Sequence, residues 1–159
     1  MGDDPLAALE EGPLFPFRDW PHELPRAAGV YSIWLDGALL YVGMAGRGRN
    51  ADELATRAAL GKVGLADRLA SHASGRRSGD QFAVYVCDRL VLPTLSREQI
   101  EAVAQGATSL DTITRDYIRG HLAFRFVAVP DGPSAHALER RARRGELRAG
   151  VPRLNPLRP

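Results

Sequence analysis

Two short segments with β-type sequences flank an Asp-Gly pair at residues 36–37, and this arrangement constrains the fold more than any other feature of the chain. Residues 29–35 (GVYSIWL) are rich in β-branched and aromatic side chains, and residues 38–43 (ALLYVG) begin directly after the pair. Asp-Gly between two apolar runs is the strongest short sequence signal for a two-residue hairpin turn. The sequence therefore predicts an antiparallel hairpin centred on residues 36–37.

Periodic segments around this hairpin complete an α+β pattern. Helical patterns occur near residues 51–60, 64–73, 96–105, 109–120 and 134–147, and strand patterns at 81–88 and 122–129. A chain of 159 residues corresponds to about one domain. We expect a small antiparallel sheet of three to four strands flanked by helices, at residues 29–159. Residues 1–28, with prolines at 13, 16, 21 and 25, are expected to be a largely irregular, Pro-rich leader.

The chain carries no sequence signal for export or membrane insertion. Its first residues, MGDDPLAALEEG, are acidic and lack the apolar core of a signal peptide, and no run approaches the ~20 apolar residues that cross a bilayer. The single cysteine, Cys87, excludes an internal disulfide framework and a cysteine-based zinc knuckle, and its apolar segment favours a buried thiol. We expect a cytoplasmic protein without membrane contact and without a small-molecule cofactor.

Arginine accounts for 20 of the 21 basic residues. Its planar guanidinium binds phosphate in a bidentate way, which favours a nucleic-acid partner, although codon bias in a GC-rich genome explains much of the excess. Residues 139–159 contain seven arginines and two acids. Such a basic end is typical of a nucleic-acid-binding surface.

Two predicted helices carry charged side chains within otherwise apolar stripes. In the helix near 64–73, the spacing i, i+3, i+4 and i+7 gives Leu65, Arg68, Leu69 and His72. In the helix near 134–147, the same spacing gives Ala135, Leu138, Glu139 and Ala142. A carboxylate on a core-facing stripe is costly unless a cation, a metal or hydrogen bonds compensate it. A buried Arg68–Glu139 pair that joins two helices would satisfy this pattern as well as a functional site would.

Tyr31 and Tyr41 lie almost symmetrically about the Asp-Gly turn, so we expect them to be cross-strand neighbours. With a simple register they would share one face of the hairpin. A single strand tyrosine usually belongs to the core or its rim. Two phenols that meet an arginine, a glutamate and a histidine in one cleft would exceed what packing requires, and this combination indicates a functional site.

The order of these residues resembles that of the GIY-YIG nuclease superfamily. Gly29-Val30-Tyr31 and, after nine intervening residues, Tyr41-Val42-Gly43 match the paired Gly-Ile-Tyr and Tyr-Ile-Gly signatures, with Val in place of Ile. The later elements of the family pattern follow in order as Arg68 with His72 one turn on, Glu139, and Asn155 in a Pro-Arg-Leu-Asn tail. The resemblance covers residues 29–155.

Two departures accompany this resemblance. The spacer between Gly43 and Arg68 is 24 residues, longer than is usual in the family, and holds the extra helix near 51–60. The segment near 82–120 is expected to be a helical insert. Both leave the core pattern intact, but they weaken any transfer of substrate from the family to this chain.

The resemblance implies a hydrolytic nuclease whose attacking water needs a base. Tyr31 is the expected base, and Tyr41 shapes or shares that role. A phenol can act so only if a cation, a metal or an adjacent base lowers its pKa. His72 would relay a proton or contact phosphate, with an exposed helix position as the alternative.

The remaining site residues are assigned by the same resemblance. Glu139 would hold one Mg²⁺ or Mn²⁺, because a carboxylate on a hard cation suits phosphate oxygens. Arg68 would neutralise charge that develops on the phosphoryl group. Asn155 would orient groups by hydrogen bonding, or simply cap the tail. The expected function is a metal-dependent endonuclease that hydrolyses DNA phosphodiester bonds, and the alternative is a non-catalytic nucleic-acid-binding module.

Two pairs of loop arginines are candidate contacts with the DNA backbone. Arg47 and Arg49 follow the hairpin, whereas Arg76 and Arg77 follow the helix that carries Arg68. Solvated loop charge is the alternative for all four. Because no second DNA-reading segment is recognisable, specificity is expected to come from the inserts, a homodimer or a larger nuclease complex. Restriction, repair, recombination and homing all remain open as biological roles.

Overall fold

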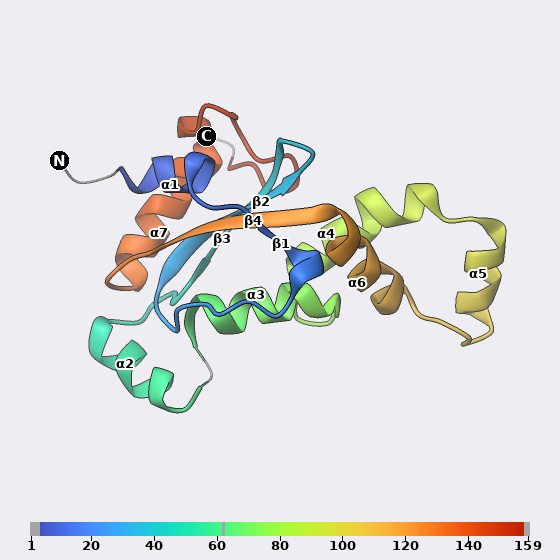
Figure 1. The fold of residues 1–159 in the computed structure, drawn as a ribbon, viewed down its shortest axis with the longest axis horizontal. Coiled ribbons are helices and arrows are strands. Elements are labelled where there is room, and N and C mark those ends of the chain that lie inside the picture. Colours follow the sequence, from blue (N-terminus) through green and yellow to red (C-terminus); the bar gives the residue numbers. More distant parts are fainter. Residues whose placement is uncertain (1–3, 62, 158–159) are drawn as a thin grey trace.

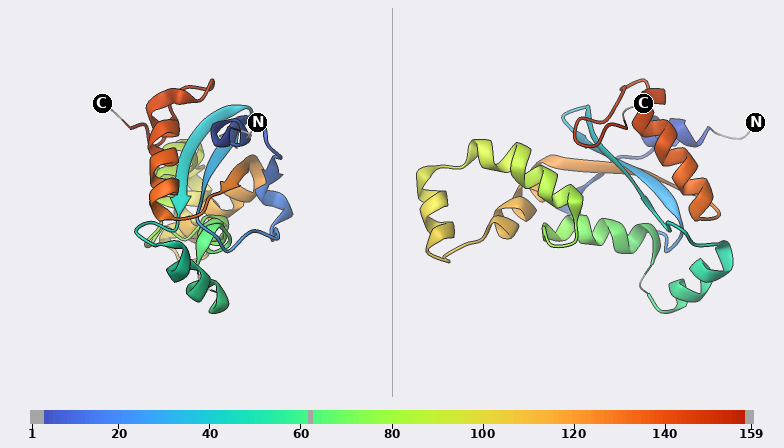
Figure 2. Two further views of the ribbon diagram at one scale, coloured as in Figure 1. Left: turned by 90° about the vertical axis from the view of Figure 1, so that its left-hand side faces the viewer. Right: turned by 180° about the vertical axis from the view of Figure 1, so that it is seen from behind.

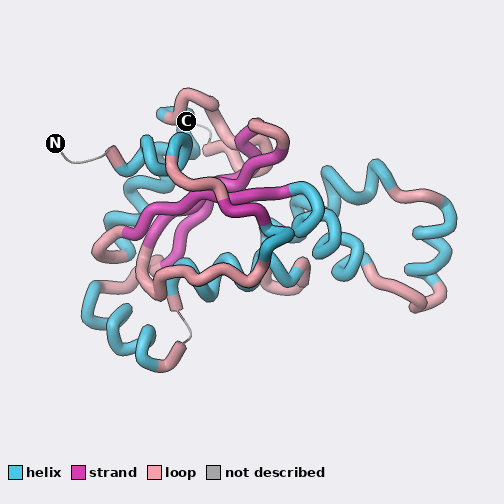
Figure 3. The backbone as a smooth tube through the Cα atoms, viewed as in Figure 1, coloured by secondary structure: helices cyan, strands magenta, loops and turns pink. Residues whose placement is uncertain are grey.

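The computed structural model describes residues 4–61 and 63–157, which form an α+β fold built on a four-stranded sheet. The sheet order is β1-β4-β2-β3, and every pairing is antiparallel. The strands are β1 (Phe15–Pro16), β2 (Gly29–Leu35), β3 (Ala38–Ala45) and β4 (Leu122–Ala128). Helices surround this central sheet (Figure 1; Figure 3). The predicted fold class is confirmed.

The hairpin turns where the sequence predicts. Asp36 and Gly37 have φ angles of 49° and 80°, the backbone that a two-residue turn between twisted strands needs. The pairing beyond the turn is not simple, because Trp34 pairs with Leu39 but Ile33 pairs with Tyr41. Leu40 is therefore the extra residue of a β-bulge. The expectation that a simple register puts both tyrosines on one face is wrong, because a regular ladder about residues 36–37 would turn them to opposite faces. The bulge brings Tyr31, which pairs with Gly43, onto the same face as Tyr41, which pairs with Ile33.

Helices cover both faces of the sheet (Figure 2). On one face, α1 (Pro5–Glu11) and α7 (Gly132–Arg141) pack on a cluster that includes Val30, Trp34 and Val42. On the other face, α3 (Gly64–Ser74) and α6 (Leu110–His121) pack on a cluster that includes Tyr31 and Ile33. The edge strand β3 thus lies between α3 and α7.

Residues 81–88 form a helix and not the predicted strand. Asp80 caps α4 (Gln81–Val86) by accepting a hydrogen bond from the backbone N–H of Ala83. Phe82 and Val86 are both buried at the i, i+4 spacing of one helical face, and the apparent alternation was misleading. A π-helical turn (Cys87–Val91) and a 3₁₀ turn (Leu92–Thr94) continue the segment, with Cys87 buried.

The other helices follow the prediction closely. Two of them are α2 (Ala51–Ala59) and α5 (Arg97–Ala104), and α5 lies at the end of the molecule away from α1 and α7 (Figure 1). The helix predicted at 134–147 ends earlier, and a π-helical turn (Ala142–Glu146) replaces its last part, where Gly145 has a φ of 99°. No helix in the described residues combines the length and apolar character needed to cross a membrane.

The segment expected to be an irregular leader contributes to the core. Leu9 and Phe17 are fully buried, and β1 pairs with β4 through Phe15 and Phe124. Its later part caps α3, because the carbonyl oxygens of residues 25 and 27 accept hydrogen bonds from the first backbone N–H groups of that helix. The prolines exclude long regular elements here, but they do not prevent packing.

Candidate active site

A cavity of about 220 Å³ lies at edge strand β3 and brings together most of the predicted site residues. Strands β2 and β3, helices α3, α4 and α7, and the tail all contribute to its wall. The predicted residues that line it are Tyr31, Tyr41, Arg47, Arg68, Glu139 and Asn155. Arg143, one of the arginines of the basic C-terminal end, lies among them. Residues from positions 31 to 155 therefore meet at one place.

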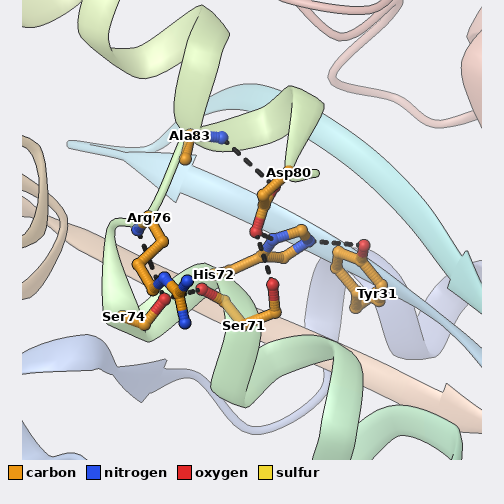
Figure 4. Close-up of polar contacts among 7 residues, drawn as sticks. All are labelled: Tyr31, Ser71, His72, Ser74, Arg76, Asp80 and Ala83. Carbon is orange, nitrogen blue, oxygen red and sulfur yellow. Dashed lines mark hydrogen bonds and ion pairs between the residues drawn. The ribbon is translucent and has the colours of Figure 1, made fainter. Parts of the chain in front are cut away.

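Behind Tyr31, two further side chains form a buried hydrogen-bond chain (Figure 4). The Tyr31 hydroxyl lies 2.6 Å from His72 Nε2, and His72 Nδ1 lies 2.7 Å from Asp80 Oδ2. Ser71 Oγ also donates to Asp80 Oδ2, at 2.9 Å. Because a carboxylate only accepts, Nδ1 carries the imidazole proton and Nε2 accepts from the Tyr31 hydroxyl. His72 is fully buried, which excludes the exposed alternative.

Burial has a large effect on the protonation states of Tyr31, His72 and Asp80. Desolvation, with a contribution from Tyr41, raises the pKa of Tyr31 well above its ordinary value, although the charge of Arg68 opposes this shift. Desolvation also lowers the pKa of His72, more than Asp80 raises it. Burial alone would raise the pKa of Asp80, but hydrogen bonds from His72 and Ser71 outweigh it and lower that pKa. Near neutral pH, Tyr31 is therefore a neutral phenol, His72 a neutral imidazole and Asp80 a carboxylate.

Gly43 and Tyr41 fit around the Tyr31 ring. A Cβ atom at Gly43 would collide with the Tyr31 hydroxyl, so the glycine is needed for the close approach of this phenol to β3. Tyr41 stacks on Tyr31 with ring centroids 6.3 Å apart. Burial raises the pKa of Tyr41, and Arg68 again opposes the shift. Within the described residues, Tyr31 is hydrogen-bonded to His72 of the His72–Asp80 pair, whereas Tyr41 is not.

Glu139 extends from α7 into the opposite wall of the cavity. Its side chain is only 7% exposed, and its Oε2 atom has no hydrogen-bond partner within the described residues. The nearest cations are Arg47 Nη2, 3.6 Å from Oε2, and Arg143 Nη1, 3.5 Å from Oε1. These are ion-pair distances, longer than good hydrogen bonds. The alternative of an Arg68–Glu139 ion pair does not occur among the described contacts, and the buried carboxylate retains capacity for a further ligand.

A hard divalent cation fits this carboxylate. Mg²⁺ is commonly held by one or two protein carboxylates, with water and substrate phosphate completing its coordination. The described residues contain no group of three or more His, Cys, Asp or Glu side chains that could enclose a metal. Glu139, whose Oε2 atom has no hydrogen bond within the described residues, is therefore the residue that would hold the cation, and the other ligands of the cation would come from solvent and substrate.

Asn155 joins the tail to edge strand β3. Its Oδ1 accepts from the backbone N–H of Val42, and its Nδ2 donates to the carbonyl oxygen of the same residue. The carbonyl oxygen of Asn155 accepts from Arg143 Nε at 2.9 Å. The amide thus bonds to the backbone, and Asn155 positions Arg143 at the cavity.

The two predicted arginine pairs differ in position. Arg47 lines the cavity, and Arg49 lines a second cavity next to it. Arg77 instead forms an ion pair with Asp111, with Nε 2.6 Å from Oδ1, and Arg76 lines a separate hollow beside α3. The structure brings only the first pair next to the candidate site.

Sequence reasoning missed Asp80. An Asp after Gly79 and before an apolar run is a typical helix N-cap, and this signal would have placed Asp80 at the start of a helix. The strand assigned to 81–88 concealed it.

Comparison of the chain with protein-family models, with curated proteins and with solved structures finds no match. The resemblance to the GIY-YIG nucleases therefore stays a prediction that rests on the motifs and on the residues gathered at the cavity.

The buried state of His72 predicts a pH-dependent stability. Its folded pKa lies below the ordinary value of about 6.5, so on acidification the unfolded chain gains a proton that the folded chain excludes. The free energy of unfolding should fall below about pH 6.5 by up to ~1.4 kcal/mol per pH unit from this residue. Urea unfolding between pH 7.5 and 5 measures it.

His72→Gln should have a flatter pH profile than the unmodified chain, whereas His121→Gln, at an exposed position, should keep the steeper one. Equal slopes for the His72 variant and the unmodified chain would contradict a neutral buried imidazole. Asp80 does not interfere, because its lowered pKa places its contribution to stability above about pH 3.9, lost only at more acidic pH.

Proposed function

We propose that this protein is a metal-dependent endonuclease that hydrolyses DNA phosphodiester bonds. The observation that carries the proposal is the convergence of Tyr31, Arg68 and Glu139 on one cavity, with His72 and Asp80 in line behind the phenol. A base, a cation and a metal-ligating carboxylate are the groups that phosphodiester hydrolysis uses. A packing role explains the buried rings but not a carboxylate oxygen left without a hydrogen bond.

The hydrogen-bond chain supports Tyr31 as the base. Because its pKa is raised, Tyr31 keeps its proton near neutral pH and must pass it on to act. His72 Nε2, 2.6 Å away, accepts that proton, and Asp80 stabilises the resulting imidazolium. Burial raises the pKa of Tyr31 and lowers that of His72, which opposes the transfer; the charge of Arg68, which lowers the pKa of Tyr31, and the Asp80 carboxylate, which raises that of His72, favour it. The Tyr31 oxygen then takes a proton from water as the water oxygen bonds to phosphorus and the bond to the leaving oxygen breaks.

The arginines and Glu139 would bind and stabilise the phosphate group. Arg68, Arg47 and Arg143 line the cavity and would neutralise charge on the phosphoryl oxygens. A divalent cation held by Glu139 would supply Lewis-acid stabilisation of the phosphate and the leaving oxygen. Arg143 is held in place by the backbone of Asn155.

DNA is the proposed partner, in the cytoplasm, and a homodimer or a larger nuclease complex would allow both strands to be cut. The arginine-rich wall of the cavity and the excess of arginine in the chain support an anionic polymer as substrate.

The test is an incubation of the purified chain with plasmid, branched and single-stranded DNA, and with RNA, in Mg²⁺, Mn²⁺ or EDTA. We expect DNA cleavage with either metal and none in EDTA. A Tyr31→Phe protein purified in parallel controls for a contaminating nuclease. Binding of DNA without cleavage would favour the non-catalytic module, and the absence of both binding and cleavage would overturn the proposal.

A further inference from the structure

A second cavity, of about 350 Å³, adjoins the candidate active site. It lies where the loop after β3, α2 and the start of α3 meet. It shares Met44, Arg47 and Arg68 with the first cavity, so the two lie next to each other. Arg49 and Arg57 line only the second cavity.

The charges around this cavity favour an anion. Four arginines line it, against the single carboxylate of Asp67. Among residues 4–61 and 63–157, no carboxylate lies within ion-pair distance of Arg49, Arg57 or Arg68. Several guanidinium groups without a carboxylate partner, around a hollow large enough for a phosphate group, are typical of a phosphate-binding site.

The backbone that carries two of these arginines is fixed. The N–H of Arg49 donates to the carbonyl oxygen of Gly46 at 3.1 Å, and its own carbonyl oxygen accepts from Gly132 at 2.9 Å. Gly132 begins α7, the helix of Glu139, so the loop of Arg47 and Arg49 is anchored to the element that carries the carboxylate. The loop that carries Arg47 and Arg49 is therefore held against the start of α7.

Arg57 comes from the helix that lengthens the spacer before Arg68. Asn50 and Glu53 form a reciprocal capping box at the start of α2, which stabilises this short helix. Arg57 lies in its last turn and lines the cavity. The backbone N–H groups of Leu65 and Ala66 at the start of α3 already donate to leader carbonyls. The guanidinium groups therefore supply the donors of this site.

We propose that the second cavity binds the phosphate group next to the scissile one on the same nucleic-acid strand. The inference rests on the proposed function, because it uses the first cavity as the site of cleavage. Arg47 and Arg68, shared by both cavities, lie between the two phosphates, whereas Arg49 and Arg57 bind only the neighbouring one. The substrate strand then runs from α7 past β3 toward α2.

The test measures binding without cleavage. A fluorescently labelled single-stranded DNA oligonucleotide is titrated with the full chain in EDTA at several salt concentrations, and anisotropy is recorded. For Arg49→Gln combined with Arg57→Gln, we expect about tenfold weaker binding and a log-affinity against log-salt slope reduced by about 0.7, because both arginines contact the same phosphate and one neutralised phosphate of single-stranded DNA contributes about that much. Arg97→Gln, at an exposed position on α5, is the matched control and should bind like the unmodified chain.

Unchanged affinity and slope in the double variant would overturn the subsite. A second titration uses inorganic phosphate alone and follows the melting temperature. Stabilisation by phosphate that the double variant loses, together with unchanged oligonucleotide binding, would show a site for free phosphate and likewise overturn the inference. The readout needs no cleavage, so an inactive protein that binds through Arg49 and Arg57 would refute the proposed hydrolysis while the phosphate subsite stands.

Discussion

Glu139→Gln should reduce metal-dependent cleavage at least ~10³-fold, because about 4 kcal/mol of transition-state stabilisation disappears with the metal-ligating charge. DNA binding should persist or tighten, since Arg47 and Arg143 lose their anionic partner. The amide keeps the size of the side chain, so the fold should survive. Single-turnover cleavage in Mg²⁺ and anisotropy in EDTA measure the two effects separately.

The matched control for this variant is Glu146→Gln. Glu146 follows on the same segment, is about half exposed and pairs with Arg141 away from the cavity. It should cut at the unmodified rate. Cleavage at the unmodified rate by a folded Glu139→Gln protein would remove Glu139 from the metal site.

Tyr31→Phe should slow cleavage by ~10²–10⁴-fold, the usual worth of a general base. The ring keeps its stacking on Tyr41, but His72 Nε2 loses its hydrogen-bond donor inside the core. An unsatisfied buried acceptor costs about 1–3 kcal/mol, so this variant should also melt at a lower temperature. Rates are therefore compared well below the melting range of both proteins.

Tyr117→Phe is the control for the loss of a phenol hydroxyl. Tyr117 packs on His121 in α6 and does not line the cavity, so its variant should cut normally. If Tyr31→Phe cuts as fast as the unmodified chain below its melting range, Tyr31 serves packing alone. The base would then have to be sought at Tyr41 or His72.

Local sequence signals predicted much of the fold. The Asp-Gly turn and the β-branched runs beside it determine the hairpin, because both depend on backbone preferences of neighbouring residues. The N-terminal segment was harder to predict, because Leu9 and Phe17 are buried through contacts with distant residues. The 81–88 helix was missed because a short apolar run fits both periods, and its cap decides between them.

The sequence predicted which helix faces carry the charged residues of the candidate site, but not which of those residues contact one another. The helical stripes placed Arg68 and Glu139 inward, and both line the cavity. They did not reveal that Arg68 and Glu139 stay apart, with Arg47 and Arg143 beside the carboxylate instead. The N-cap signal of Asp80 is local, but its role behind Tyr31 depends on the hydrogen bond between Tyr31 and His72, which are 41 residues apart, and no local pattern encodes that contact.

The bulge at Leu40 decides whether the two phenols of the hairpin lie on the same face. Nine residues separate Tyr31 from Tyr41, and a two-residue turn leaves four strand residues on one side of it and three on the other. In a regular antiparallel ladder, that odd difference would turn the two phenols to opposite faces. A chain with this spacing and this turn can therefore place both phenols in one cavity only if its strands contain an odd number of extra residues.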